Sequence, residues 1–230
     1  MLKLEAVVID NGGFDLKADF DVPTGAKVAV IGPSGAGKST LIGGIAGFLP
    51  VRAGRIVWHG QDIGHADPGK RPVAMLFQDG NLFPHLTVAQ NVGLGLHPDL
   101  RLNQAERDRV ASAIARVGLA GMETRKPAAL SGGQQSRAAL ARVLVQGRPL
   151  LLLDEPFAAL GPALKVEMLG LVEDLVRETG ATLLMVSHDP GDARRIADQV
   201  VLVTEGVACP PRDTAALLDD PPPALRDYLG

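Results

Sequence analysis

Eight consecutive residues, Gly32 to Ser39, combine glycines with one lysine and one hydroxyl group in the order Gly-Pro-Ser-Gly-Ala-Gly-Lys-Ser. This order matches G-x-x-x-x-G-K-[S/T], the pattern of loops that bind nucleotide phosphates. Glycines let the backbone turn tightly and bring its N–H groups to phosphate oxygens. In such a loop Lys38 reaches the β- and γ-phosphates and the Ser39 hydroxyl holds Mg²⁺. The predicted ligands of ATP in this stretch are Gly32, Pro33, Ser34, Gly35, Ala36, Gly37, Lys38, Ser39 and Thr40.

Polar side chains also follow three other apolar runs, at the point where each predicted strand ends. Asp154 and Glu155 come after four leucines, Gln78 follows Phe77, and His188 comes two residues after Val186. The carboxyl ends of parallel strands lie at one edge of a sheet, which is where α/β proteins bind ligands. We therefore expect these side chains to gather around the phosphates.

Each of these residue types suits one task in phosphate transfer to water. Asp154 can hold Mg²⁺ beside Ser39, and Gln78 is a further candidate ligand for Mg²⁺ or water. Glu155 can polarise the attacking water as a general base, and His188 can contact the γ-phosphate and orient that water. Considered singly, the residues also fit plainer roles: a carboxylate pair capping a helix, an exposed glutamine and a structural histidine.

A second glycine-rich helix start occurs at Ser131-Gly132-Gly133-Gln134, before a run with helical periodicity. The N-terminus of a helix carries free N–H donors and partial positive charge, so this segment predicts a second anion site. The alternative interpretation is that Ser131 simply caps the helix.

The elements that must position these residues alternate between strand and helix, which predicts a parallel sheet in an α/β core. Two strands around the turn Asn11-Gly12-Gly13 precede that core, and the pattern between residues 86 and 147 is mostly helical. Predicted strands cover residues 2–9, 14–22, 27–31, 55–59, 72–77, 150–153, 182–186 and 199–203. Predicted helices cover residues 40–46, 103–117, 135–144, 163–179 and 190–197.

Composition and sequence pattern argue against several classes of protein. The 230 residues are 46% hydrophobic and 21% charged, with a net charge of -3 and no long basic run, which argues against a nucleic-acid binder. Cys209 is the single cysteine, so no intramolecular disulfide can form. No signal peptide and no apolar run of about 20 residues is evident, so we expect a chain that is soluble or that reaches a membrane through a partner.

With Leu130 to Gln134 between the glycine loop and Leu-Leu-Leu-Asp-Glu-Pro, the chain resembles the ATP-binding-cassette family, the nucleotide-binding subunits of membrane transporters. The resemblance implies a P-loop NTPase core with an N-terminal antiparallel β subdomain and a helical insertion. It implies one domain over 1–230, with a core at 1–82 and 148–230 and a helical subdomain at 83–147.

The same resemblance assigns the roles of the site residues. Gln78 becomes the Q-loop residue, Glu155 the catalytic glutamate and His188 the switch histidine. It further implies a head-to-tail homodimer in which Ser131, Gly132, Gly133 and Gln134 contact the ATP held by the other subunit's Lys38.

Within that family, the segment from Arg71 to Leu96 is similar to bacterial importers, and Asn91 to Leu96 with the compact length resembles the ATPase subunits of thiamine importers. That implies permease subunits, an indirect link to a periplasmic substrate-binding protein, no nucleic acid, and a peripheral place on the cytoplasmic face of the inner membrane. The alternatives are importers of polyamines, iron or sulfate, or a soluble non-transport ATPase of the family.

Three features depart from the family pattern. The signature continues as Gln134-Gln135-Ser136-Arg137, where family members commonly carry an extra arginine. Gly161 stands where the family's D-loop usually has aspartate, which bears on coupling between the two ATP sites. No tyrosine lies in the first strand region to stack on adenine, and Phe14 is the nearest aromatic residue besides Phe20.

Overall fold

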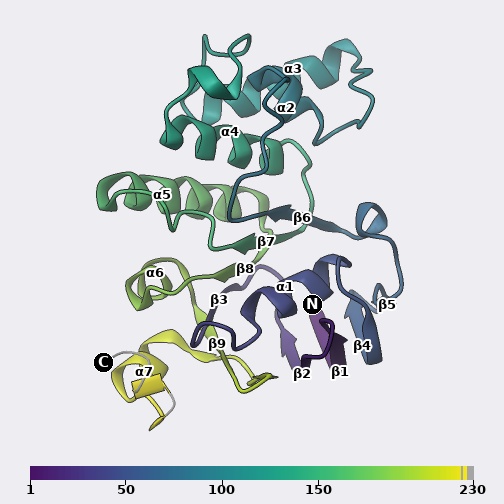
Figure 1. Cartoon of the computed structure of the whole chain (residues 1–230), viewed down its shortest axis with the longest axis vertical. Coiled ribbons are helices and arrows are strands. Elements are labelled where there is room, and N and C mark those ends of the chain that lie inside the picture. Colours follow the sequence, from purple (N-terminus) through teal and green to yellow (C-terminus); the bar gives the residue numbers. More distant parts are fainter. Residues whose placement is uncertain (224, 227–230) are drawn as a thin grey trace. The chain divides into compact units, whose positions relative to one another are not determined.

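The computed structural model describes residues 1–223, 225 and 226, and its described part forms two compact units (Figure 1). The first unit comprises Met1–Val73, Pro149–Glu155 and the chain from Gly180 onward. The second comprises Ala74–Arg148 and Pro156–Thr179.

The N-terminal strands of the first unit form the predicted antiparallel layer. β1 (Leu2–Asp10) pairs with β2 (Asp15–Val22) on one side and with β4 (Val51–Trp58) on the other, and β5 (Gln61–Asp62) continues the layer beside β4. The Asn11 N–H donates to the Phe14 carbonyl oxygen at 2.9 Å, which closes the turn between β1 and β2. The hairpin expected around Asn11-Gly12-Gly13 is therefore confirmed.

β4 begins at Val51, four residues before the predicted strand, because a glycine lets it pass a bulge. The pairing of β1 with β4 shifts register after Glu5, where Ala6 adopts a φ of 47°. Gly54 lies opposite with a φ of 78°, and a Cβ there would come within 2.3 Å of the Ala6 carbonyl oxygen. The mostly exposed residues at the start of β4 lack the continuous apolar run on which the prediction rested.

The parallel strands expected in the core lie side by side in the order β9-β3-β8-β7. Their bounds are β3 Lys27–Ile31, β7 Leu150–Asp154, β8 Thr182–Val186 and β9 Gln199–Thr204. All three neighbouring pairs are parallel, and almost every residue of these strands is buried, as in sheets covered on both faces. Two short strands not predicted from the sequence, β10 (Val207–Ala208) and β11 (Arg212–Asp213), pair with β9.

Helices of the first unit pack on these strands. They are α1 (Lys38–Ala46), α6 (Pro190–Ile196) and α7 (Thr214–Asp219). The described residues of this unit also include a 3-10 turn, η1 (Pro68–Lys70). Ala29 and Ile31 of β3 form a core cluster with Ala193 of α6 and Leu217 of α7. Because side chains alternate along a strand, Val28 and Val30 face the other side of the sheet, where they are also fully buried.

A buried arginine holds the C-terminus of α1. Arg71 is only 2% exposed, and its guanidinium donates to the carbonyl oxygens of Gly44 and Ile45 at 2.8 and 2.9 Å. It also donates to the carbonyl oxygens of Gly64 and Ala66 at 2.8 and 2.9 Å. The helix dipole favours a cation at this end of α1. Burial lowers the pKa of Arg71, and the charge of nearby Asp62 opposes that shift.

The second unit is mainly helical. Its elements are α2 (Val88–Gly93), α3 (Gln104–Arg116), α4 (Gly132–Leu144), α5 (Pro162–Thr179), the turn η2 (Pro127–Ala129) and β6 (Val73–Leu76), whose first residue belongs to the first unit. Thr87 and Gln90 form a capping box at the start of α2, and Asn103 with Glu106 forms another at α3. The helix predicted over 103–117 is thus confirmed. In the described part of the chain, no helix combines the length and apolar character needed to cross a membrane.

Candidate functional site

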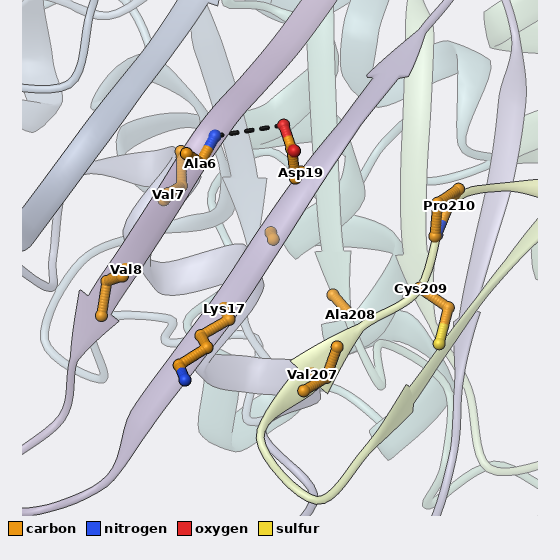
Figure 2. A pocket seen from close by; sticks show the side chains of 10 residues that line it. Ala6, Val7, Val8, Lys17, Asp19, Val207, Ala208, Cys209 and Pro210 are labelled. Atoms are coloured by element: carbon orange, nitrogen blue, oxygen red, sulfur yellow. Dashed lines mark hydrogen bonds between the residues drawn. The ribbon is translucent and has the colours of Figure 1, made fainter.

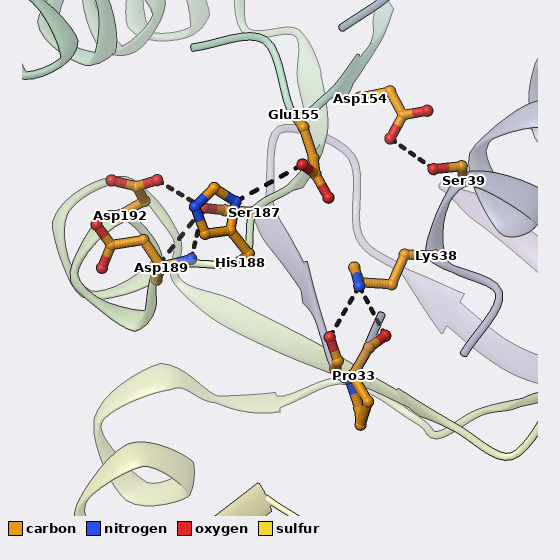
Figure 3. A network of polar contacts seen from close by, with 10 residues as sticks. Pro33, Lys38, Ser39, Asp154, Glu155, Ser187, His188, Asp189 and Asp192 are labelled. Carbon is orange, nitrogen blue, oxygen red and sulfur yellow. Dashed lines mark hydrogen bonds and ion pairs between the residues drawn. The ribbon is translucent and has the colours of Figure 1, made fainter. Parts of the chain in front are cut away.

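The glycine loop connects the buried strand β3 to α1, as the pattern predicts. Lys38 is the first residue of α1 and is 7% exposed. Its Nζ donates to the carbonyl oxygens of Gly32 at 2.8 Å and of Pro33 at 2.9 Å, so the ammonium group lies inside the loop (Figure 3). Burial lowers the pKa of Lys38, and the charges of Glu155 and Asp154 oppose this shift.

Glycine suits three positions of the loop, each for a different structural reason. Gly32 has a φ of 148°, and a Cβ there would lie 2.0 Å from the Val203 carbonyl oxygen. At Gly37 a Cβ would come within 2.9 Å of the Phe14 ring, so this aromatic side chain packs against the loop. Gly35 has no atom within 4 Å of such a Cβ, but its φ of 76° favours glycine.

The loop also meets the end of β7. The Ser39 Oγ donates to the Asp154 Oδ1 at 3.0 Å. Burial raises the pKa of Asp154, the hydrogen bond from Ser39 and the charge of Lys38 lower it, and Glu155 adds to the increase. A hydroxyl and a carboxylate oxygen side by side are ligands that Mg²⁺ prefers. Among the described residues, no group of three or more His, Cys, Asp or Glu side chains is placed so that it could hold a metal ion.

Glu155 and His188 face each other beside this pair. Glu155 Oε2 lies 3.6 Å from His188 Nδ1, and the Glu155 side chain is 24% exposed (Figure 3). The Glu155 backbone has a φ of 44°, and its N–H donates to the Val186 carbonyl oxygen at 3.2 Å. A left-handed conformation at a non-glycine residue costs free energy, and such positions cluster at functional sites. The sheet therefore holds the Glu155 backbone in a conformation that its residue type does not favour.

The residue before His188 makes a polar contact that was not predicted from the sequence. Ser187 Oγ donates to Asp192 Oδ2 at 2.5 Å, and both residues are buried. The only signal for this pair was an aspartate five residues after a strand-end serine, within the first turn of a helix, and nothing marked it as buried.

The remaining predicted residues lie in the second unit. Gln78 is exposed and follows β6, and its role as a Mg²⁺ or water ligand remains a prediction. Ser131 caps α4 through a box with Gln134: Ser131 Oγ accepts from the Gln134 N–H at 3.3 Å, and Gln134 Oε1 accepts from the Ser131 N–H at 3.0 Å. The predicted cap is confirmed, and it is compatible with an anion site because no acidic residue lies in the first turn.

Gly132 and Gly133, at the start of α4, differ in the space that surrounds them. A Cβ at Gly132 would meet nothing within 4 Å, so the fold itself does not require glycine there. A Cβ at Gly133 would lie 2.3 Å from Leu164 Cδ2, so this glycine lets α4 approach α5. Gly132 and Gln78 also line the same cavity of about 600 Å³ within the second unit.

Another hollow of about 400 Å³ lies on the first unit, over β1, β2 and β10 (Figure 2). Its walls are mainly apolar, with Lys17 and Asp19 as the charged residues, and Asp19 Oδ1 accepts from the Ala6 N–H at 3.1 Å. None of the predicted site residues lines it, so we assign it no part in the nucleotide site.

The chain is similar to known proteins in sequence and in fold. The family model of ABC transporters matches residues 16–158. The Thiamine import ATP-binding protein ThiQ of Ruegeria sp. (strain TM1040) is 66% identical over 230 residues, 100% of both chains, and that of Cereibacter sphaeroides is 60% identical over the same span.

A solved structure, a dimeric post-hydrolysis state of the ATP-binding cassette MJ0796 bound to ADP and Pi, has a TM-score of 0.80 and 28% identity, and the match covers 93% of this chain and 99% of that one. This likeness confirms the predicted P-loop NTPase fold with its antiparallel layer and helical insertion. With a family model over more than half of its length and relatives matching from end to end, the chain belongs to the ABC transporter family.

Proposed function

We propose that this chain is the ATP-binding and ATP-hydrolysing subunit of a bacterial thiamine importer. The observation that carries ATP hydrolysis is the arrangement in the first unit, where Lys38, the pair Ser39–Asp154 and the pair Glu155–His188 surround the glycine loop. Thiamine as the transported substrate is supported by the relatives that are 66% and 60% identical over the whole chain. This support favours thiamine over the polyamine, iron and sulfate importers that share most of the motifs.

In the proposed reaction, the loop binds the triphosphate of ATP. Lys38 Nζ exchanges its bonds to two backbone carbonyl oxygens for phosphate oxygens, which compensates the charge of this buried ammonium group. Ser39 and Asp154 fit Mg²⁺, with Gln78 as the further candidate ligand. When bound, Mg²⁺ neutralises charge that develops on the transferred phosphoryl group.

Glu155 acts as the general base that takes a proton from the attacking water. Its carboxylate is half-buried beside His188, whose imidazole would orient the water and contact the γ-phosphate. The left-handed backbone at Glu155 is hydrogen-bonded to Val186 at the end of β8, so the sheet that carries the loop also directs this side chain.

The second anion site serves a neighbouring subunit in this proposal. Two copies pair head to tail, so that the α4 start of one, with Ser131, Gly132, Gly133 and Gln134, completes the ATP site of the other. The dimeric cassette among the similar structures supports pairing, and the open space around Gly132 supports close approach of a ligand. Closure of the pair would act on permease subunits in the membrane, and a periplasmic substrate-binding protein would deliver the vitamin to them. The chain would then lie peripherally on the cytoplasmic face of the inner membrane and bind no nucleic acid.

The central experiment compares Glu155→Gln with Glu205→Gln. Glu205 has a similar left-handed φ of 48° but lies in the turn between β9 and β10, so it controls for backbone strain. We expect Glu155→Gln to bind ATP, to lose turnover by at least ~10²-fold and to accumulate as a dimer, because only the base is removed. Glu205→Gln should hydrolyse ATP like the wild type. Unchanged turnover of Glu155→Gln would reject the assignment of the base.

The substrate is tested by co-purifying the chain with its permease and measuring uptake of radiolabelled thiamine in vesicles. Uptake should require ATP inside the compartment that holds this chain and should persist in excess polyamine, iron or sulfate. Uptake of one of those solutes instead of thiamine would reject the proposed substrate while leaving the ATPase assignment intact.

A further inference from the structure

We infer that Ser187 and Asp192 form a buried clamp that positions His188, which makes Asp192 a positioning residue for ATP hydrolysis. The inference rests on the proposed function, since it concerns the histidine that faces the γ-phosphate in that proposal. The inference adds Asp192 of α6, which lies outside every motif identified in the sequence, to the residues of the proposed site.

The clamp is built from short and buried contacts. Ser187 and Asp192 are only 5% and 8% exposed, and Ser187 Oγ donates to Asp192 Oδ2 at 2.5 Å. The same Oγ accepts from the Asp189 N–H at 3.1 Å and lies 3.5 Å from the Asp189 carbonyl oxygen (Figure 3). One hydroxyl group therefore joins the residues on both sides of His188 to the first turn of α6.

The backbone ties the same loop to the strands of the site. The Ser187 N–H donates to the carbonyl oxygen of Val30 at 3.2 Å, in the strand that enters the glycine loop. One residue earlier, the Val186 carbonyl oxygen accepts from Glu155. The His188 side chain, in contrast, is 56% exposed and points toward Glu155. The loop is thus fixed at its base while the imidazole at its tip is presented to the site.

The burial of the Asp192 carboxylate needs an explanation. A carboxylate removed from water loses hydration, and a hydrogen bond restores only part of it, so an apolar pair of similar size would often be at least as stable. The first turn of α6 favours a negative charge, which accounts for some of the compensation. Stability alone would not require the polar pair Ser187–Asp192. Fixing the direction of the His188 side chain does require it, because hydrogen bonds are directional.

The test uses ATP turnover and ATP affinity of the purified full chain. Asp192→Leu removes the acceptor, and we expect kcat to fall by about 10- to 10²-fold, the cost of misplacing a reacting group by about 1 Å. The affinity for ATP should stay within about twofold, because Lys38 and the loop are untouched. Asp192→Asn keeps an acceptor oxygen for Ser187 and should retain turnover within about threefold. Arg194→Ala, which breaks an exposed ion pair of the same helix with Asp219, is the matched control and should be unchanged.

The decisive readout is a double-mutant cycle with His188→Ala. If the clamp acts through the imidazole, Asp192→Leu costs nothing further once His188 is removed. An equal loss in both backgrounds would overturn the inference, as would full turnover of Asp192→Leu.

If Asp192→Leu does not fold, Ser187→Ala/Asp192→Leu removes both buried polar groups and is tested in the same cycle with the same expectations. Wild-type protein that hydrolyses no ATP would reject the proposed function itself. A wild type that hydrolyses ATP, together with additive variants, would reject only the clamp.

Discussion

Ser39 Oγ lies 3.0 Å from Asp154 Oδ1, although 115 residues separate them in the chain. The contact joins the start of α1 to the end of β7, and it places two oxygen atoms where the predicted Mg²⁺ would bind. Because burial raises the pKa of Asp154 above its ordinary value of 3.8, an ionised Asp154 costs stability while no cation is bound.

Replacing Asp154 by asparagine should therefore stabilise the nucleotide-free protein at neutral pH. A carboxyl group with a raised pKa in the folded state favours folding when protonated, and this contribution is lost as the pH rises through the folded-state pKa. The melting temperature of Asp154→Asn should exceed that of the wild type at pH 7, and the difference should vanish toward about pH 4. Added Mg²⁺ and ATP should stabilise the variant less than the wild type. A difference that is independent of pH would contradict the assignment.

The two glycines at the start of α4 should respond differently to alanine. Gly133→Ala forces Leu164 to move, so we expect a loss of about 1 kcal/mol in the free energy of unfolding, as for other overpacked sites. Gly132→Ala meets no atom, and alanine is the better helix former, so stability should be unchanged or higher. Denaturant unfolding measures both. If Gly132 contacts the partner's ATP, Gly132→Ala should still weaken ATP-dependent dimerisation in Glu155→Gln protein.

Arg71 should be required for the stability of the phosphate-loop helix. Arg71→Met leaves the carbonyl oxygens of Gly44 and Ile45 without this donor at a buried site, so we expect a loss of roughly 2–4 kcal/mol. Arg71→Lys should recover only part of it, since one ammonium group cannot reproduce the planar fork. Lys70→Met, at the neighbouring exposed ion pair with Asp67, is the control and should change stability little. A loss as large at Lys70 as at Arg71 would refute the assignment.

Gly161 can be converted to the aspartate usual in the family without steric cost. No atom lies within 4 Å of a Cβ at Gly161, and its carbonyl oxygen accepts from the Lys165 N–H at 3.0 Å, so it occupies the cap position of α5. Aspartate favours that position over glycine by a few tenths of a kcal/mol, so the variant should fold normally. If the resemblance holds at this loop, Gly161→Asp should raise the Hill coefficient of ATP hydrolysis. An unchanged coefficient would show that coupling does not depend on this aspartate.

Much of the fold could be predicted because its signals are local. Continuous apolar runs predicted β3, β7, β8 and β9, and the cap at Ser131 predicted where α4 begins. The two-residue strands β10 and β11 were not predicted, since two residues carry no periodicity. The start of β4 was misplaced because its pairing depends on a bulge at Ala6 in another strand.

The glycine loop, its lysine and the polar strand ends are determined by residue type and spacing along the chain, and sequence was sufficient to identify them. The distances between them depend on which strands become neighbours. The order β3-β8-β7 brings Ser39 to Asp154 and Glu155 to His188, and the folding of α6 against β3 buries Asp192 beside Ser187. Strand order and burial arise from packing among segments remote in sequence, so only the tertiary structure decides these contacts.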